Sequence, residues 1–392
     1  APRGSDAFGG IRRGSGTLLL AGGARAMSSG PWFDALFGFR EPSSMDECRA
    51  KFDVEDDATG RGTLISKANG KRYGAGRFST PSLAELRADV KRADKPRTGT
   101  LKLSHIASSD VFALHADEEF SGAFFQAASQ FNCLEFASPY ATPEDGVTIY
   151  EHDKTQGPAC SLAAPAATVF RNYFVPCKGA TGQSRDKQLN LLGDVLREVQ
   201  GSDGEAAGDL VEVRNGYTNS DEEELQQFND KLRAVADRDK LAGLLRIGLH
   251  EDVEVPWTGT RYQLQQESDR QKVSQAFCSA LAVGYSQGSV EGWEPLARLV
   301  LEASYEATLW AGARQAANGG SPKVVLTLLG GGVFGNAPEW ILSAIARACV
   351  RLEGHGLDVI VVHFRMVNQQ LVDQLDAAME EEKKKAAEGG KL

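Results

Sequence analysis

A run of glycines at the end of an apolar segment offers the first chemistry in this sequence. Val324–Leu328 is predicted to be a buried strand, and Gly330, Gly331, Gly332 and Gly335 follow it. So many glycines suggest a backbone that adopts unusual dihedrals or lies very close to a ligand. A helix is predicted directly after them, and a loop aimed at a helix N-terminus offers free amides to an anion, typically a phosphate. A tight packing turn is the alternative interpretation.

Acidic side chains crowd a second loop, around Gly146. The acids are Glu144, Asp145, Glu151 and Asp153. Like charges held close together raise the pKa of one member, which can then serve as a general acid or base. Asp145 is the best placed of the four, because Gly146 follows it. Histidine is the side chain best suited to acid–base chemistry near neutral pH, so His152 could share this chemistry, or it could be a structural hydrogen-bonding residue.

The composition excludes several classes of protein. The chain has 392 residues, 42% of them hydrophobic and 24% charged, with a net charge of −10. An acidic surface repels nucleic acid, and no apolar run approaches the roughly 20 residues that span a bilayer. The six cysteines form no CxxC pair and the histidines are dispersed. We therefore expect a soluble globular protein with no metal and no cofactor, and the sequence leaves open whether it has a protein partner.

The pattern along the chain predicts an α/β protein, in which apolar strands alternate with amphipathic helices. Strands are expected near 111–115, 123–128, 247–255, 273–283, 324–328 and 357–362, and helices near 158–170, 188–199, 220–245, 293–311 and 367–385. Ligands bind at the carboxyl ends of the strands in such sheets, which places Ser129 and Gly331 on one rim. The Asn69-Gly70 pair predicts a hairpin between residues 63 and 78.

Four regions follow from this pattern. Residues 1–26 are rich in arginine and small residues and poor in acids, as in an organelle transit peptide. They indicate a mitochondrial or plastid protein if they are a transit segment, and a cytoplasmic one otherwise. Residues 27–98 are predicted to form a small N-terminal α+β subdomain. Residues 99–365 are predicted to form the core, with a helical insertion at about 178–260. Residues 366–392 are predicted to form a helix and a tail.

Three stretches resemble the macrodomain family. Val111–Ser129, VFALHADEEFSGAFFQAAS, resembles its first strands, which end in Gly-Asp-Ile and Asn-Ala-Ala-Asn. Asp117 then falls on the aspartate that holds adenine, Gln126 on the first asparagine and Ser129 on the second. DGVTIYEHDKTQGPAC, from Asp145, resembles Gly-Val-Asp-Gly-Ala-Ile-His followed by Gly-Pro. The glycine loop resembles the second phosphate loop, Gly-x-Gly-x-x-Gly.

The resemblance implies a three-layer macrodomain-like fold with a largely parallel central sheet. It also implies binding of ADP-ribose or a related nucleotide, with hydrolysis of an ADP-ribosyl bond as the associated activity. The implied ligand-binding residues are Asp117, Gln126, Ser129, Gly146, Val147, Thr148, Gly330, Gly331, Gly332, Val333, Phe334 and Gly335. The candidate catalytic residues are Asp145, His152, Asn132 and Glu135, of which Asn132 and Glu135 could also hold the distal ribose.

The departures from the family pattern leave a second function open. Gln126 and Ser129 replace both asparagines, so the bonds to the distal ribose must be rebuilt or lost. A glycohydrolase in the family carries a Gly-Gly-Gly stretch followed by Gln-Glu-Glu, and here only Glu339 follows the glycines. A non-catalytic structural or assembly subunit that retains the fold without the ligand is therefore the alternative.

Overall fold

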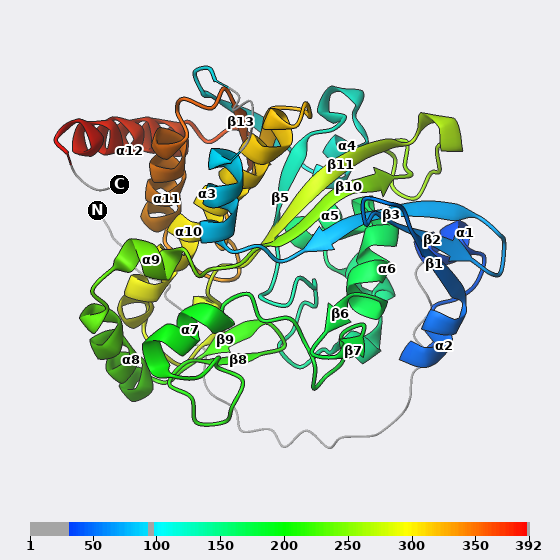
Figure 1. The fold of residues 1–392 in the computed structure, drawn as a ribbon, viewed down its shortest axis with the longest axis horizontal. Helices are drawn as coiled ribbons and strands as arrows, with labels where there is room; N and C mark the ends of the chain where they lie inside the picture. The colour runs from blue at the N-terminus through cyan, green and yellow to red at the C-terminus, as the bar shows by residue number, and fades with distance from the viewer. Residues whose placement is uncertain (1–30, 93–97, 390–392) are drawn as a thin grey trace, which may run out of the picture.

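The computed structural model describes residues 31–92 and 98–389 (Figure 1). The expected targeting segment at residues 1–26 lies outside the described residues. Within the described ranges, no helix is long and apolar enough to cross a membrane.

A nine-stranded sheet forms the centre of the molecule, in the order β1-β2-β3-β10-β11-β5-β12-β13-β4 (Figure 1). Its strands are β1 Phe52–Asp56, β2 Gly62–Ser66, β3 Arg72–Ser79, β4 Lys102–Ser108, β5 Phe124–Ala128, β10 Gly248–Val255, β11 Gln271–Cys278, β12 Lys323–Leu326 and β13 Asp358–Phe364. The strands from β11 to β4 run parallel, and the strands from β1 to β11 pair antiparallel. Two short hairpins stand apart, β6 Pro176–Cys177 with β7 Ala180–Thr181 and β8 Glu212–Arg214 with β9 Tyr217–Asn219.

Helices cover both faces of the sheet. The helices are α1 Pro31–Phe37, α2 Met45–Ala50, α3 Leu83–Lys91, α4 Val111–Ala116, α5 Gln156–Ala163, α6 Pro165–Tyr173, α7 Gly193–Gln200, α8 Glu222–Ala234, α9 Arg238–Ala242, α10 Val290–Ala317, α11 Pro338–Arg351 and α12 Gln369–Ala387. The helices α3, α10 and α11 pack together on one face, and α4, α5 and α6 on the other. The predicted three-layer α/β class is confirmed, and the predicted parallel sheet is the half that runs from β11 to β4.

The N-terminal hairpin extends this same sheet. The strands β2 and β3 flank the Asn69-Gly70 turn as predicted, and β3 pairs with β10 at Phe78 and His250. The helix α1 carries an aromatic cluster, in which Trp32, Phe33 and Phe37 are completely buried. Edge-to-face contacts of Phe33 and Phe37 with Phe52 fix α1 against β1.

Three predictions of secondary structure were wrong, one of them the helix near 220–245, which is divided into α8 and α9 at Val235. Residues 111–115 form the helix α4 rather than a strand, because Asp110 caps the amide of Phe112 at 3.1 Å and the buried residues follow a helical spacing. The predicted helix at 158–170 is two helices, since Pro165 cannot continue α5. The strand β4 was missed because it is an edge strand with few buried side chains.

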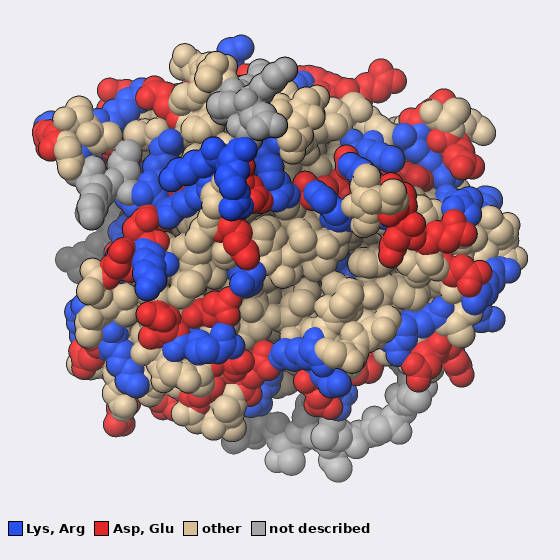
Figure 2. Space-filling model, in the orientation of Figure 1, with Lys and Arg blue, Asp and Glu red and all other residues tan. Residues whose placement is uncertain are grey.

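Basic side chains gather on one face although the chain is acidic. Figure 2 shows them over α3, α10 and α11. Acids neutralise this cluster: Arg87 and Arg351 both bond Glu306, and Arg314 bonds Glu251 and Asp89. The cluster therefore ties α3, α10 and α11 together.

Candidate functional site

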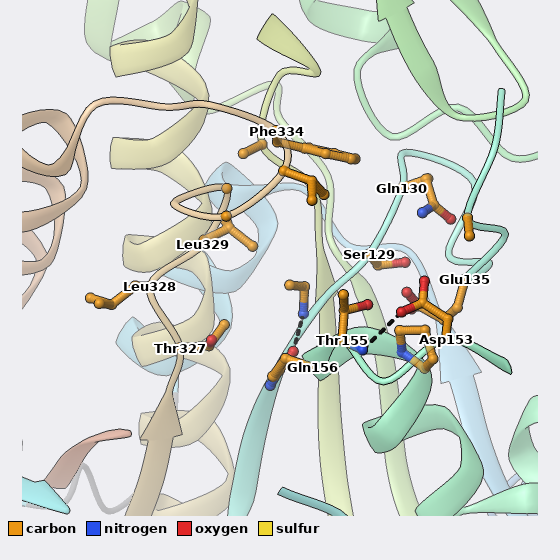
Figure 3. Close-up of a pocket in the computed structure, with 18 of the residues that line it drawn as sticks. Ser129, Gln130, Glu135, Asp153, Thr155, Gln156, Thr327, Leu328, Leu329 and Phe334 are labelled. Carbon is orange, nitrogen blue, oxygen red and sulfur yellow. Dashed lines mark hydrogen bonds between the residues drawn. The ribbon is translucent and has the colours of Figure 1, made fainter. Parts of the chain in front are cut away.

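A cavity of about 370 Å³ opens between the carboxyl ends of β5 and β12 (Figure 3). The two strands pair only at Phe124 and Phe125, opposite Val324 and Val325, and separate beyond that point. A gap between neighbouring parallel strands is where ligands bind in α/β sheets. The lining residues are Ala128, Ser129, Gln130, Glu135, Ala137, Asp153, Thr155, Gln156, Gly157, Pro158, Tyr217, Ala280, Tyr285, Thr327, Leu328, Leu329, Gly330, Gly332, Val333 and Phe334.

The N-terminus of α5 closes one side of this pocket. The Gln156 side chain accepts a hydrogen bond from the Ala128 amide at 2.7 Å and donates one to the Gln126 carbonyl at 2.8 Å. These two bonds replace the hydrogen bonds that β5 lacks where β12 separates from it. They also fix the first turn of α5 against β5. The backbone amides of Gln156 and Gly157 donate to no protein acceptor among the described residues. Free amides at a helix N-terminus favour an anion.

The glycine loop forms the opposite side. Gly330 and Gly335 adopt φ values of 75° and 71°, which favour glycine. The Asn336 amide closes the loop on the Gly330 carbonyl at 3.0 Å. The amides of Gly332, Val333 and Phe334 have no protein acceptor in the part of the chain that the structure describes. Consecutive free amides of this kind form an anion-binding concavity.

Glu135 is the acid of the pocket. A turn at Cys133, which has a φ of 62°, directs the chain so that the Glu135 amide donates to the Tyr150 hydroxyl at 3.0 Å. Figure 3 shows the Glu135 carboxyl beside Ser129 and Asp153. Burial raises the pKa of Glu135 well above its usual range, and the Asp153 charge raises it further, whereas Arg171 and Ser129 act in the opposite direction. Burial therefore favours the protonated form of Glu135, which can give up a proton.

Aromatic rings form the outer wall. The rings of Tyr217, Tyr285 and Phe334 lie 5.6 to 5.9 Å apart in edge-to-face and tilted contacts. The Tyr217 hydroxyl donates to the Phe136 carbonyl at 2.6 Å, which fixes the ring. This wall gives the pocket an apolar face for a sugar or a base.

A smaller cavity of about 110 Å³ adjoins the pocket and shares Thr155, Gln156 and Thr327 with it. It lies at the ends of β4 and β13, beside Asp110 and Phe364. Arg261 holds the Asp110 carboxylate through two bonds of 2.8 Å. Phe364 is 68% exposed, and the Arg365 guanidinium carbon lies 4.9 Å from the centre of its ring. The ring still offers exposed apolar surface to a flat ligand.

Half of the ligand-binding and catalytic residues expected from the sequence belong to this region. Ser129, Glu135, Gly330, Gly332, Val333 and Phe334 line the pocket, while Gly331 and Gly335 lie in the same loop without lining it. Ser129 and the glycine loop do share one rim, at the carboxyl ends of the strands.

Several expected residues lie elsewhere. Asp117 follows α4, and its carbonyl accepts from Gln271 at the start of β11, which is the opposite end of the sheet. Gln126 points away from the pocket and bonds Thr308 of α10. Asn132 bonds Gln188 and the Leu134 amide, so both ends of its side chain are used inside the fold.

Asp145 and His152 are also outside the main pocket. The Asp145 carboxylate accepts from the Thr142 amide at 2.8 Å, where it caps a short 3₁₀ helix. His152 is exposed and borders a shallow depression behind Glu135. The carboxyl that reaches the pocket next to Glu135 is instead that of Asp153.

The amides expected to form a first phosphate loop hold a carboxylate of the chain itself. Glu41 accepts hydrogen bonds from the amides of Val147 and Thr148 at 2.8 and 2.9 Å, and from the Thr148 hydroxyl at 2.6 Å. The Tyr173 hydroxyl donates to the same carboxylate at 2.7 Å. A side chain at Gly146 would collide with Glu41. Gly146 therefore leaves space for the Glu41 carboxylate, which is an anion of the chain itself.

Sequence reasoning missed the role of the segment Thr155–Pro158. Gln156 and Gly157 join α5 to β5, and Asp153 accepts from the Thr155 amide at 2.8 Å. A glycine and a proline at the start of a helix were the available signal, because together they indicate a helix N-terminus that approaches other backbone closely. No group of three or more metal-ligating side chains occurs in the described residues.

No family model and no curated protein matches the sequence. Similar solved structures are poly(ADP-ribose) glycohydrolases. One, from Deinococcus radiodurans in complex with ADP-ribose, is 13% identical with a TM-score of 0.38, and the match covers 79% of this chain and 94% of that one. Another, from Thermomonospora curvata, is 14% identical with a TM-score of 0.39 and covers 84% and 93%. At these TM-scores no residue role is transferred, and the roles below follow from the geometry of this chain.

Proposed function

We propose that the chain binds ADP-ribose or a related nucleotide in the pocket between β5 and β12, and hydrolyses a ribosyl bond there. The observation that supports this is a buried carboxyl, Glu135, placed between two groups of free backbone amides. One group belongs to α5 and the other to the glycine loop. Amides suit a phosphorylated ligand and a protonated carboxyl suits a leaving group, so the pocket fits a substrate that has both.

The diphosphate lies between the N-terminus of α5 and the amides of Gly332 to Phe334. Among the described residues, Glu135 and Asp153 are the charged members of the main lining, and the smaller cavity adds Asp110 and Lys154. The amides therefore hold the phosphate oxygens in the main pocket. A neutral Glu135 avoids repelling these oxygens. Among phosphorylated nucleotides, ADP-ribose is chosen because of the macrodomain resemblance in the sequence.

The two ends of the nucleotide occupy different cavities. The base stacks on the exposed Phe364 in the smaller cavity, with Asp110 within the same lining. The distal ribose enters the main pocket, between Glu135 and the wall formed by Tyr217 and Phe334. The shared residues Thr155 and Gln156 lie between the two cavities, where the diphosphate crosses.

The chemistry is hydrolysis with a proton donor and a proton acceptor. Glu135 gives its proton to the leaving oxygen or nitrogen as the bond to the ribose C1 breaks. A water molecule adds to C1 and passes a proton to the Asp153 carboxylate. Transfer of that proton to Glu135, directly or through water, restores both groups, so no other reactant is consumed.

Calorimetric titration with ADP-ribose and turnover of an ADP-ribosylated protein test this proposal. Glu135→Gln keeps the shape of the pocket and is expected to retain binding while lowering turnover by about 10² or more. Glu118→Gln, an exposed acid outside the pocket, is the matched control and is expected to behave as wild type. Wild-type turnover equal to buffer would contradict the hydrolase and leave a binding protein.

The alternative is a non-catalytic structural subunit that keeps the fold without the ligand. The Glu41 carboxylate favours it, because it already fills one of the two loops expected to hold phosphate. Absence of any ADP-ribose binding at millimolar concentration would support this alternative and contradict the proposal.

A further inference from the structure

Arg171 of α6 is a charged side chain in the interior of the molecule, only 1% exposed. Its guanidinium donates to the Cys133 carbonyl at 3.1 Å, to the Ser161 hydroxyl at 2.8 Å and to the Thr168 hydroxyl at 3.1 Å. His250 lies 3.2 Å from Nη1, and the ring of Phe277 stacks 3.7 Å from the guanidinium carbon. Its acceptors are thus all neutral.

Among the described residues Arg171 forms no ion pair, since no carboxylate lies within 4 Å of its nitrogens. Removing a cation from water without a paired anion is costly, and proteins rarely retain such a group unless it interacts with charge nearby. Burial lowers the pKa of Arg171 only to about 10, so the side chain keeps its charge at neutral pH. The interior of this protein therefore contains a fixed positive charge.

The carboxyl whose charge interacts with that of Arg171 is that of Glu135. Arg171 bonds the carbonyl of Cys133, two residues before Glu135, and so anchors the turn that directs Glu135 into the pocket. The titratable and charged groups around the pair are Tyr150, Cys133, Cys160 and His250 near Arg171, with Asp153 and Tyr217 on the pocket side of Glu135. Of these, only Asp153 is a carboxylic acid, and its charge opposes ionisation of Glu135.

We infer that Arg171 is a positioning residue whose buried charge allows Glu135 to lose its proton inside the fold. This inference rests on the proposed function, because a proton donor must also exist as a carboxylate after it has acted. Without the cation, ionised Glu135 would be a buried anion beside Asp153 with no positive charge near it to offset its own. With it, the proton can leave Glu135 and return. The hydrogen bond to Cys133 holds the two charges at a constant separation.

Infrared difference titration of Glu135 tests the inference without any ligand. The carboxyl band of Glu135 is identified as the one that Glu135→Gln removes. In the wild type, Glu135 is expected to deprotonate reversibly within the pH range where the fold persists. A Glu135 that stays protonated up to alkaline unfolding would overturn the inference, whatever the variants show.

Two variants cancel the positive charge of the Arg171 side chain in different ways. Arg171→Gln keeps hydrogen-bonding capacity without charge, and Ser161→Asp places a carboxylate where Nη2 now donates at 2.8 Å. Each is expected to raise the Glu135 midpoint by more than one pH unit, whereas Arg171→Lys is expected to raise it less. An unchanged midpoint in either folded variant would show that Arg171 has a packing role only.

Activity then separates this inference from the proposed function. If the chain hydrolyses ADP-ribosyl bonds, the pH profile of turnover is expected to shift with the infrared midpoint in Arg171→Gln. If it does not, the infrared result still decides whether Arg171 controls the ionisation of Glu135.

Discussion

Gly157 lies directly beneath Glu135, at the point where α5 meets the end of β5. A Cβ atom at Gly157 would overlap both the Glu135 Oε2 atom and the Ala128 carbonyl oxygen. The absence of a side chain thus allows the acid to rest above the first turn of the helix. This contact joins the two features that define the pocket, the free amides and the buried carboxyl.

Replacing Gly157 by alanine is therefore expected to damage both stability and function. The added methyl group must push Glu135 outward or move α5 away from β5, at a cost of about 1–3 kcal/mol. ADP-ribose affinity is expected to fall because the α5 amides lose their position. Urea unfolding and calorimetric titration measure the two effects. Gly354→Ala is the control, since nothing lies within 4 Å of a Cβ there, and wild-type behaviour in both variants would refute this contact.

Ionisation of Glu135 is expected to lower the stability of the protein as the pH rises. Burial raises the folded pKa of Glu135 above its unfolded value of about 4.3. The stability that protonated Glu135 contributes to the folded protein is then fully present below the unfolded pKa, and it is lost as pH rises through the folded pKa. Glu135→Gln cannot ionise, so the free energy of unfolding of the wild type should fall relative to it above about pH 4.3. Urea unfolding at several pH values measures the difference, which should stay constant for Glu118→Gln.

Much of the parallel half of the fold could be predicted from the sequence. Continuous apolar runs such as the one at Val324 are typical of buried strands, and β5, β12 and β13 were located in this way. The helix α4 was not, because its six residues contain apolar side chains that fit either period. The hydrogen bond that the Phe112 amide donates to the Asp110 carboxylate marks the start of the helix in the structure.

The site was harder to predict, since it depends on contacts between distant segments. The glycine loop and Ser129 could be placed on one rim because both follow strands of a parallel sheet. Nothing in the sequence indicated that Glu41 would fill the loop at Val147, over 100 residues away. The use of Asp153 rather than Asp145 depends likewise on a capping bond to Thr142 that turns Asp145 aside.

The ion cluster of α3, α10 and α11 provides a prediction on stability. Glu306 has only 5% of its side chain exposed, and it bonds Arg87 at 2.6 Å as well as Arg351. Glu306→Gln leaves Arg87 and Arg351 paired with Asp239 but removes their charged hydrogen bonds to Glu306, which is expected to cost about 1–3 kcal/mol. Glu294→Gln, which breaks a half-exposed pair with Arg298, should cost no more than about 1 kcal/mol. Thermal or urea unfolding of both variants measures the contrast, and equal costs would contradict it.

The same cluster should make the protein sensitive to acid. Burial raises the pKa of Glu306, but the hydrogen bonds and charges of Arg87 and Arg351 outweigh it, and the pKa is lowered. A lowered folded pKa gives stability that is present above the unfolded pKa and lost as pH falls through the folded one. The difference between wild type and Glu306→Gln should therefore shrink below about pH 4.3. A difference that stays constant down to acid unfolding would show that the charge of Glu306 does not matter.

The carboxylate of Glu41 provides the last prediction, because it decides what the loop at Val147 is for. It satisfies two backbone amides and two hydroxyl groups, so Glu41→Ala leaves four donors without an acceptor. We expect a loss of about 3 kcal/mol in the free energy of unfolding, against little change for the exposed Glu47→Ala control. ADP-ribose affinity should be unaltered, since none of these groups lines the pocket between β5 and β12. A tighter complex in Glu41→Ala, measured by calorimetry, would mean that the vacated loop binds phosphate and that Glu41 competes with the ligand.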